Sequence, residues 1–282
     1  MAYKVPAVIT TCDYETAMDG DYWYIYLKSS GTFAFKFSKT KVDVFLQGGG
    51  GGGDKHSVGN GENGMSGGGG GAGGYQVTQY DQQISGSYVI AIGAGGETGQ
   101  NGGDTSAFGF TALGGEGAKA TKGGKLGTAA GGDGGYYYGG GSSSASNGKD
   151  GEDGKQAFGV GEVFYGAGGG GAKSSFTAAS GRGGKTGGGD GSDGPTSPGL
   201  ANTGSGGGGN HGGTGGTGGS GIVILRGTQD DQLPVKFDGV TLQSILYEGQ
   251  EVMHLIHDGT KIFTERIKEW LKPKTRFALQ EV

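Results

Sequence analysis

The residues that most often carry out chemistry do not form a recognisable catalytic set in this sequence. The GKT run at 184–186 matches the end of a phosphate-binding loop, but the first glycine of that motif is replaced here by Ala179. His254 and His257 are three residues apart on an expected strand, so they face opposite sides and make a poor metal site. No Ser/His/Asp set and no pair of carboxylates stands out. We therefore expect no enzyme activity, no cofactor and no metal ion.

Two clusters of aspartate and glycine, residues 150–154 and 189–194, are the candidates for ion binding. Asp-Gly repeats hold calcium in β-roll proteins, where they recur as tandem nonapeptides with a regular apolar position. The tandem pattern is missing from this sequence. We therefore expect both clusters to form solvated turns, with calcium binding as the alternative.

Three consecutive tyrosines stand between Gly-Gly pairs, directly before the polar stretch 142–147. On a loop they would offer a large contact area at a small cost in conformational entropy, as tyrosines do in binding loops. The alternative is that they cover the outer face of the glycine-rich part. Two sets of candidate contact residues result: Tyr136, Tyr137 and Tyr138, and, after a glycine run, Asp54, Lys55 and His56.

Glycine content divides the chain into the three parts that must position these residues. Glycine supplies 74 of the 282 residues, and 69 of them lie within residues 48–227. We expect an N-terminal β region at 1–47, a glycine-rich domain at 48–227 that is closed by a strand at 222–226, and a small β-repeat domain at 228–282. The apolar content of 32% excludes an ordinary packed core throughout the chain.

The first and last parts have β-type patterns. Residues 22–27 (YWYIYL), 32–37 (TFAFKF) and 41–47 (KVDVFLQ) predict three short antiparallel strands with one apolar face. In the last part, acidic-Gly pairs recur every ten residues and predict the tight turns of a β-meander over 234–263. Residues 264–271 (TERIKEWL) predict a short helix.

The glycine-rich part is either a solvated linker or an ordered assembly of bare backbone. Ordering glycine costs roughly 0.5–1 kcal/mol more than ordering alanine, so order requires many backbone hydrogen bonds. Apolar residues at 108–110 and 163–165, which we expect to pack, argue against a linker. Strands at 42–46 and 222–225 would hold both ends of this part in one sheet. We therefore expect a mainly β and irregular fold, with a small antiparallel β base, a bundle of polyglycine II-type helices bonded laterally, and the C-terminal β-meander.

Overall charge and cysteine content exclude several classes of protein. The net charge of −5 and the pI of about 5.4 argue against nucleic acid or an anionic membrane bound by bulk electrostatics. The single cysteine, Cys12, excludes an internal disulfide framework. The sequence has no apolar run of membrane-spanning length and no charged stretch followed by an apolar one at its start. We expect no membrane insertion and no signal peptide.

Three stretches resemble the glycine-rich domain of tail and fibre proteins in bacteriophages and prophages, especially those of Gram-positive hosts. They are the strand-to-glycine junction at 42–53 (VDVFLQGGGGGG), residues 86–96 (GSYVIAIGAGG) and the closing strand at 219–226 (GSGIVILR). The resemblance covers about residues 30–227. The KFDG and LYEG repeats of the last part look like the small repeats that end such phage proteins, which often have Asn-Gly at the turn.

The resemblance implies a virion protein of the tail, made in the host cytoplasm and released by lysis. Its most specific form is a receptor-binding adhesin that contacts a host surface receptor or glycan through loops between glycine helices. The alternative is a structural connector or decoration protein that docks to other tail or baseplate proteins without binding a receptor. Tail-tip proteins are often trimers, so a homo-oligomer is expected. Glycine-rich sandwiches are also similar to a region of anaplastic-lymphoma-kinase-type receptors, which the expected lack of a signal peptide does not favour.

Overall fold

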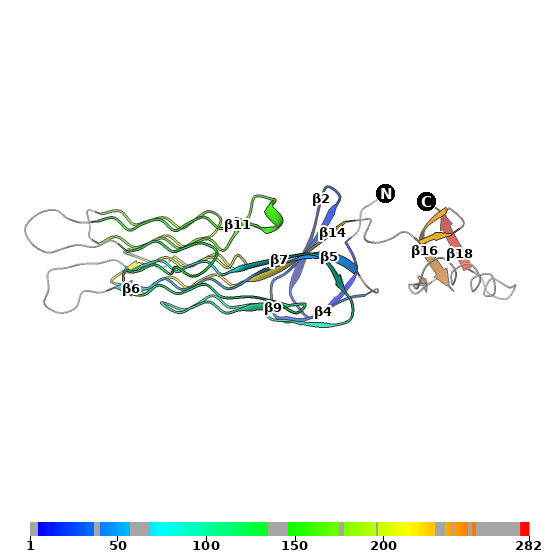
Figure 1. The fold of residues 1–282 in the computed structure, drawn as a ribbon, viewed down its shortest axis with the longest axis horizontal. Coiled ribbons are helices and arrows are strands. Elements are labelled where there is room, and N and C mark those ends of the chain that lie inside the picture. Colours follow the sequence, from blue (N-terminus) through cyan, green and yellow to red (C-terminus); the bar gives the residue numbers. More distant parts are fainter. Residues whose placement is uncertain are drawn as a thin grey trace, which may run out of the picture.

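The structure is a computed structural model, and it places two β-sheets at one end of a set of lengthwise glycine-rich segments (Figure 1). The described residues are 5–36, 40–56, 68–134, 146–174, 178–195 and 197–228, with strand backbone at 235–237, 240–247, 250–251 and 277–281.

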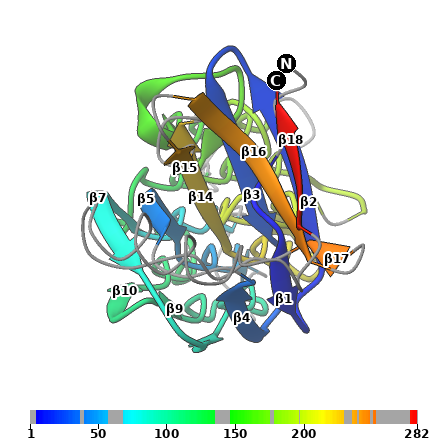
Figure 2. The same cartoon turned by 90° about the vertical axis from the view of Figure 1, so that its right-hand side faces the viewer.

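A five-stranded antiparallel sheet forms the base. Its order is β2 (Tyr14–Asp19), β3 (Tyr22–Leu27), β14 (Ile222–Thr228), β5 (Thr40–Gln47) and β7 (Gln76–Ile84). Figure 2 shows β14 between β3 and β5. The predicted pairing of the strands that bracket the glycine-rich part is confirmed, because Leu225 of β14 lies opposite Val44 of β5. The sheet therefore joins the two ends of that part.

A second, three-stranded sheet consists of β1 (Val8–Thr10), β4 (Gly31–Phe35) and β8 (Tyr88–Ile90). The expectation that the strands near 22–27, 32–37 and 41–47 form one group is wrong, because β4 pairs with β1 and β8 instead of with its chain neighbours. The chain thus alternates between two layers.

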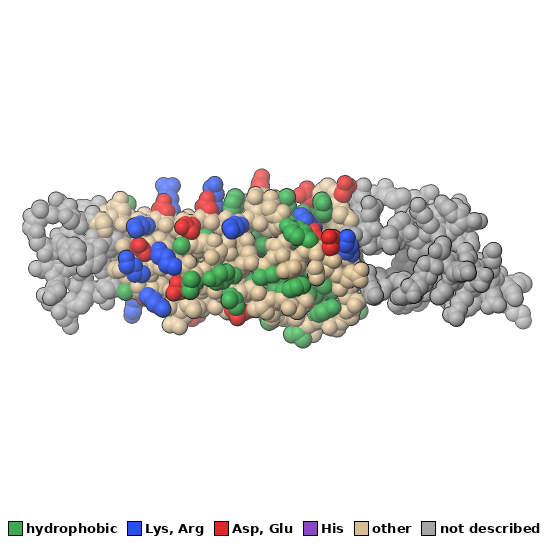
Figure 3. Space-filling model, in the orientation of Figure 1, with side chains coloured by type: hydrophobic (Ala, Val, Ile, Leu, Met, Phe, Trp, Pro, Cys, Tyr) green, Lys and Arg blue, Asp and Glu red, His purple; other side chains and the backbone are tan. Residues whose placement is uncertain are grey.

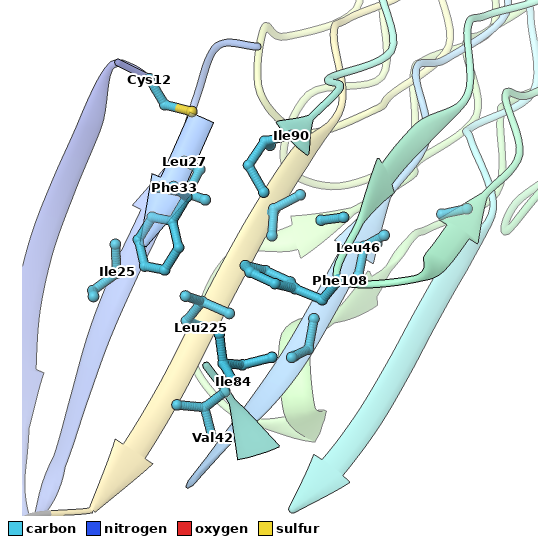
Figure 4. Packing of buried hydrophobic residues seen from close by; sticks show 14 of the residues in the cluster. Cys12, Ile25, Leu27, Phe33, Val42, Leu46, Ile84, Ile90, Phe108 and Leu225 are labelled. Atoms are coloured by element: carbon cyan, nitrogen blue, oxygen red, sulfur yellow. The ribbon is translucent and has the colours of Figure 1, made fainter. Parts of the chain in front are cut away.

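The main apolar core lies between these two sheets (Figure 4). Alternation along β3 places Trp23, Ile25 and Leu27 on one face, and all three are fully buried. Phe33 of β4 meets them from the other layer and packs against Phe108, with ring centroids 5.8 Å apart. Phe108 follows β9 (Thr105–Ala107) and precedes β10 (Phe110–Ala112), which form a small hairpin.

The opposite face of the base sheet is covered by a short excursion of the glycine-rich part. This excursion contains β11 (Lys155–Gln156), a 3-10 turn at Ala157–Gly159 and β12 (Phe164–Tyr165). The ring of Phe45 lies 5.3 Å from that of Tyr165 and 5.9 Å from that of Phe158. The expected packing at 108–110 and 163–165 is therefore confirmed for Phe108 and Tyr165, whereas Val163 is exposed.

The expected bundle of polyglycine II-type helices is wrong. In the described residues the regular structure is β-strands in several sheets, mostly antiparallel, and the 3-10 turn at Ala157–Gly159 is the only helical element. The glycine-rich segments between the strands are extended chain. Their backbone groups form hydrogen bonds to other extended segments, and these bonds account for the order of the glycine-rich part.

Residues 48–54 show how these extended segments are held. Every third amide donates to the same neighbouring segment, so three neighbours are bonded in turn. The pairs are Gly48–Tyr75, Gly51–Ala72 and Asp54–Gly69; Gly49–Gly103 and Gly52–Gln100; and Gly50–Gly219 and Gly53–Gly216, all at 2.8–2.9 Å. Carbonyls of the same residues accept from Gly96, Gly99, Gly115, Ala118 and Gly207. This segment is therefore enclosed by backbone on all sides.

Glycine is required in this segment because the neighbours are so close. A Cβ atom on Gly50 would overlap the carbonyl oxygen of Ser205, and one on Gly51 would overlap that of Glu116. The overlapping atoms belong to rigid backbone, so they cannot move aside as a side chain would. Residues 48–53 are all buried without contributing a side chain.

The C-terminal part contains a further antiparallel sheet of β15 (Val235–Phe237), β16 (Val240–Tyr247), β17 (Gln250–Glu251) and β18 (Phe277–Glu281). Within the β-meander predicted over 234–263, the consecutive strands β15, β16 and β17 pair antiparallel. The strand β18, which pairs with β16, was not predicted. The predicted helix at 264–271 lies outside the described residues.

Candidate functional site

Several segments end together at the side of the glycine-rich part that is remote from the base sheet, which we call the distal end. There Asp54 donates its amide to Gly69 at 2.9 Å and accepts from the amide of Asn210 at 3.0 Å. The strand β6 (Lys55–His56) pairs in parallel with β13 (Asn210–His211). Figure 1 shows β6 far from β4 and β5.

The candidate contact residues Asp54, Lys55 and His56 are only partly available for binding. Both carboxylate oxygens of Asp54 accept backbone amides at 2.7 Å, one from Lys55 and one from Ala120. Asp54 is therefore committed to holding two segments together. Lys55 is exposed, and its backbone belongs to β6. The backbone of His56 lies opposite His211, and the His56 side chain is outside the described residues.

The other candidate contact residues, Tyr136, Tyr137 and Tyr138, lie outside the described residues. The described residues on either side of it are anchored at the distal end. The amide of Gly134 donates to the carbonyl of Thr121 at 2.8 Å, and the hydroxyl of Ser174 donates to the carbonyl of Ser146 at 2.9 Å.

The Asp-Gly clusters are extended segments whose side chains bond to neighbouring backbone. Asn147, Asp150 and Asp153 each accept an amide from a parallel segment, at 2.8, 2.7 and 2.8 Å. The donors are Ala179, Arg182 and Lys185. The expectation of solvated turns is wrong for the cluster at 150–154, which is extended chain. Its aspartate carboxylates accept amides of the neighbouring segment, as backbone carbonyls do for the inner segments. Asp190 does the same for Gly183.

Four lysines on the flank of the distal end form a cluster that is not among the predicted site residues. We call Lys119, Lys122, Lys125 and Lys149 the lysine patch. Three of their ammonium groups surround Asp133, with N–O distances of 3.9 Å for Lys122, 3.4 Å for Lys125 and 3.2 Å for Lys149. Figure 3 shows several Lys and Arg side chains gathered over the glycine-rich half of the described surface.

Asp133 is held in its charged form within this patch. Partial burial acts to raise the pKa of its carboxyl, but the hydrogen bond from the Gly123 amide and the ammonium groups of Lys149, Lys125 and Lys122 outweigh it. The net result is a pKa below the ordinary value for aspartate. Asp133 therefore stays ionised and organises the lysines around it.

Metal-binding and membrane-spanning features are not found in the described part of the chain. His, Cys, Asp and Glu side chains there do not gather in threes at a spacing that would hold a metal ion. The described residues also contain no apolar helix of membrane-spanning length.

A family model described as a glycine-rich domain matches residues 28–228. The matched stretch begins within the base, includes all the lengthwise segments and ends with β14. A comparison with curated proteins finds no match.

Proposed function

We propose that this chain, which belongs to the family of glycine-rich domains over residues 28–228, is a receptor-binding protein of a bacteriophage tail. In this role it contacts the surface of a host cell and acts by binding alone, without catalysis or a cofactor. Its place is the virion, where its neighbours are other tail or baseplate proteins.

The observation that carries the proposal is the anchoring of the described residues that flank the stretches 57–67 and 135–145. Before the first of these stretches, Lys55 lies opposite Asn210 in the pair β6–β13, and after it the amide of Gly68 donates to the carbonyl of Asn210. Gly134 and Ser146, on either side of the second, are bonded to Thr121 and Ser174. The described residues that flank both stretches therefore lie at the distal end.

The construction of the glycine-rich part supports contact at this end instead of in an interior cavity. Its inner segments, such as 48–53 and 68–74, are buried and in contact with backbone on all sides. Such a scaffold holds the described residues at its distal end in fixed positions, which lowers the entropic cost of binding a partner there. The resemblance of residues 42–53, 86–96 and 219–226 to phage tail and fibre domains directs the proposal to a host surface.

A structural connector of the tail is the second candidate, and one observation favours it. The strand β2 is an edge of the base sheet, and all six of its residues are exposed. An exposed edge strand offers unpaired backbone groups to a neighbouring protein. A connector would use this edge and need no host receptor.

Binding of the purified chain to a panel of bacterial strains tests the proposal. We expect the fluorescently labelled protein to bind a subset of strains, and the variant Tyr136→Ala/Tyr137→Ala/Tyr138→Ala to bind them less well. Absence of binding to every strain, together with copurification with tail proteins, would replace the adhesin by the connector. The mass of the protein in solution tests whether it is a homo-oligomer, such as the trimer expected of tail-tip proteins.

A further inference from the structure

The lysine patch has features that the fold itself does not require. The side chains of Lys119, Lys122 and Lys149 are 80%, 76% and 73% exposed. Lys119 and Lys122 lie directly opposite each other across a two-residue turn, with mutual backbone hydrogen bonds of 2.9 Å. Like charges in directly opposed positions destabilise a β pair. An anion bound outside the turn would relieve this repulsion.

The two carboxylates among these lysines are recessed and already in use. Asp133 is 17% exposed and accepts the amide of Gly123 at 3.1 Å. Glu116 is 23% exposed and accepts the amide of Lys125 at 2.8 Å, while its other oxygen lies 4.0 Å from the ammonium group of Lys119. With Asp54, which accepts the Ala120 amide in the turn between Lys119 and Lys122, the four lysines and three carboxylates leave a formal charge of +1. The outward surface of the patch is therefore cationic.

This cationic surface is local. The chain as a whole carries a net charge of −5. The hairpin of β2 and β3 at the base has the opposite character, with Glu15 and Asp19 exposed on β2, and Asp13 and Asp21 exposed beside it. An anionic partner is consequently attracted to the distal flank and repelled from the base.

We propose that the lysine patch binds an acidic polysaccharide whose sugar units carry carboxylates, an inference that rests on the proposed function and names the class of its receptor. The patch already accommodates a carboxylate, because three of its ammonium groups surround that of Asp133. Its modest charge matches a polymer with widely spaced anions. Nucleic acid, with one charge per about 1.7 Å of duplex axis, requires a far more basic surface.

Binding to polygalacturonate, with neutral dextran as the reference polymer, tests the proposal. We expect the protein to bind polygalacturonate and not dextran, and the binding to weaken with salt. The variant K119Q/K122Q/K125Q/K149Q should bind about tenfold or more weakly, because four ammonium groups that can pair with carboxylates of the polymer are lost. The variant with arginine at the same four positions should retain binding.

A matched control removes the same charge elsewhere. The variant K28Q/K41Q/K155Q/K185Q lowers the net charge equally but leaves the patch intact, and it should bind as the unmodified protein does. Unfolding midpoints of all variants establish that each is folded. Equal weakening in the patch and control variants, no binding to polygalacturonate, or equally tight binding to single-stranded DNA would each overturn the inference.

Cell binding separates this inference from the proposed function. A protein that binds bacterial strains but not polygalacturonate retains the adhesin role and loses the acidic receptor. A protein that binds polygalacturonate through the patch but no strain retains the ligand class and loses the adhesin role.

Discussion

The guanidinium of Arg226 meets the carboxylate of Asp43 at 2.6 Å, although 183 residues separate them in the sequence. The two residues lie directly opposite each other in the pair β5–β14. The Arg226 guanidinium also lies over the rings of Phe158 and Tyr22, with distances of 4.3 and 4.8 Å to the centroids. This contact fastens the start of the glycine-rich part to its end.

Removing one member of this pair should destabilise the whole chain. Asp43→Ala leaves a largely buried guanidinium without its partner, and we expect a loss of about 2–3 kcal/mol in the free energy of unfolding, below the range for fully buried pairs. Urea titration measures it. Lys41, which is also on β5, forms an exposed ion pair with Asp81 of β7, so Lys41→Ala is the control and should cost much less. Equal losses in the two variants would show that the buried pair is unimportant.

A methyl group added inside the glycine lattice should not be tolerated. In Gly50→Ala the new Cβ overlaps the carbonyl oxygen of Ser205, so we expect a loss of at least about 3 kcal/mol or failure to fold. Gly194→Ala is the matched control, because the nearest atom to its Cβ would be 3.8 Å away. Thermal unfolding of both variants checks this. A Gly50→Ala protein with an unchanged midpoint would contradict the close packing.

A side chain that accepts a backbone amide along the outer segments should be replaceable by one of the same shape that also has an acceptor oxygen. Asp150→Ala removes the acceptor for the Arg182 amide, and we expect a loss of about 0.5–1 kcal/mol. Asp150→Asn keeps an acceptor oxygen in the same place and should cost less. Asn147, three residues earlier in the same segment, accepts the Ala179 amide in this way. Urea titration of both variants distinguishes hydrogen bonding from charge. If the asparagine variant is as unstable as the alanine variant, charge is the larger effect.

Buried tyrosines should make the protein sensitive to high pH. Burial raises the pKa of Tyr165 to about 12, and burial also raises the pKa values of Tyr24 and Tyr26. A folded-state pKa above the unfolded value of about 10 means that the folded state binds the phenolic proton more tightly. This stabilisation is complete below about pH 10 and is lost as the pH rises through about 12.

The Tyr165→Phe variant checks the assignment. Its unfolding midpoint should fall less between pH 10 and 12 than that of the unmodified protein, because one of the groups that must ionise has been removed. Identical pH profiles for the two proteins would assign the alkaline sensitivity to other groups.

Alternating side chains allowed individual strands to be predicted, but not their neighbours. The alternation of Trp23, Ile25 and Leu27 with tyrosines predicts β3, and the run at 222–226 predicts β14. Sequence order favours pairing between consecutive strands. The insertion of β14 between β3 and β5 depends on the return of a chain almost two hundred residues later, which local patterns do not encode.

The state of the glycine-rich part was predicted less well than its boundaries. The need for many backbone hydrogen bonds followed from glycine entropy, but the expected helix bundle was wrong. The partner of each amide changes with every residue, as Gly49, Gly50 and Gly51 show by bonding to Gly103, Gly219 and Ala72. Because these partners come from distant parts of the chain, no local sequence pattern specifies them.

The candidate site was also only partly accessible from the sequence. Asp54 was expected to contact a receptor, but its oxygens are occupied by the amides of Lys55 and Ala120. The lysine patch was missed, although Lys119, Lys122 and Lys125 are spaced three apart in the sequence. That spacing was the available signal. The approach of Lys149 and Asp133 to these lysines is a tertiary feature.

Amide hydrogen exchange of the inner glycine segments tests the central claim most directly, namely that lateral backbone hydrogen bonds hold the glycine-rich part as a rigid scaffold. The amides of residues 48–53 and 69–74 are buried and bonded to neighbouring segments, so we predict that they exchange as slowly as those of β5 and β14. Exchange of these amides at the rate of an unfolded peptide, while β5 and β14 remain protected, would contradict it.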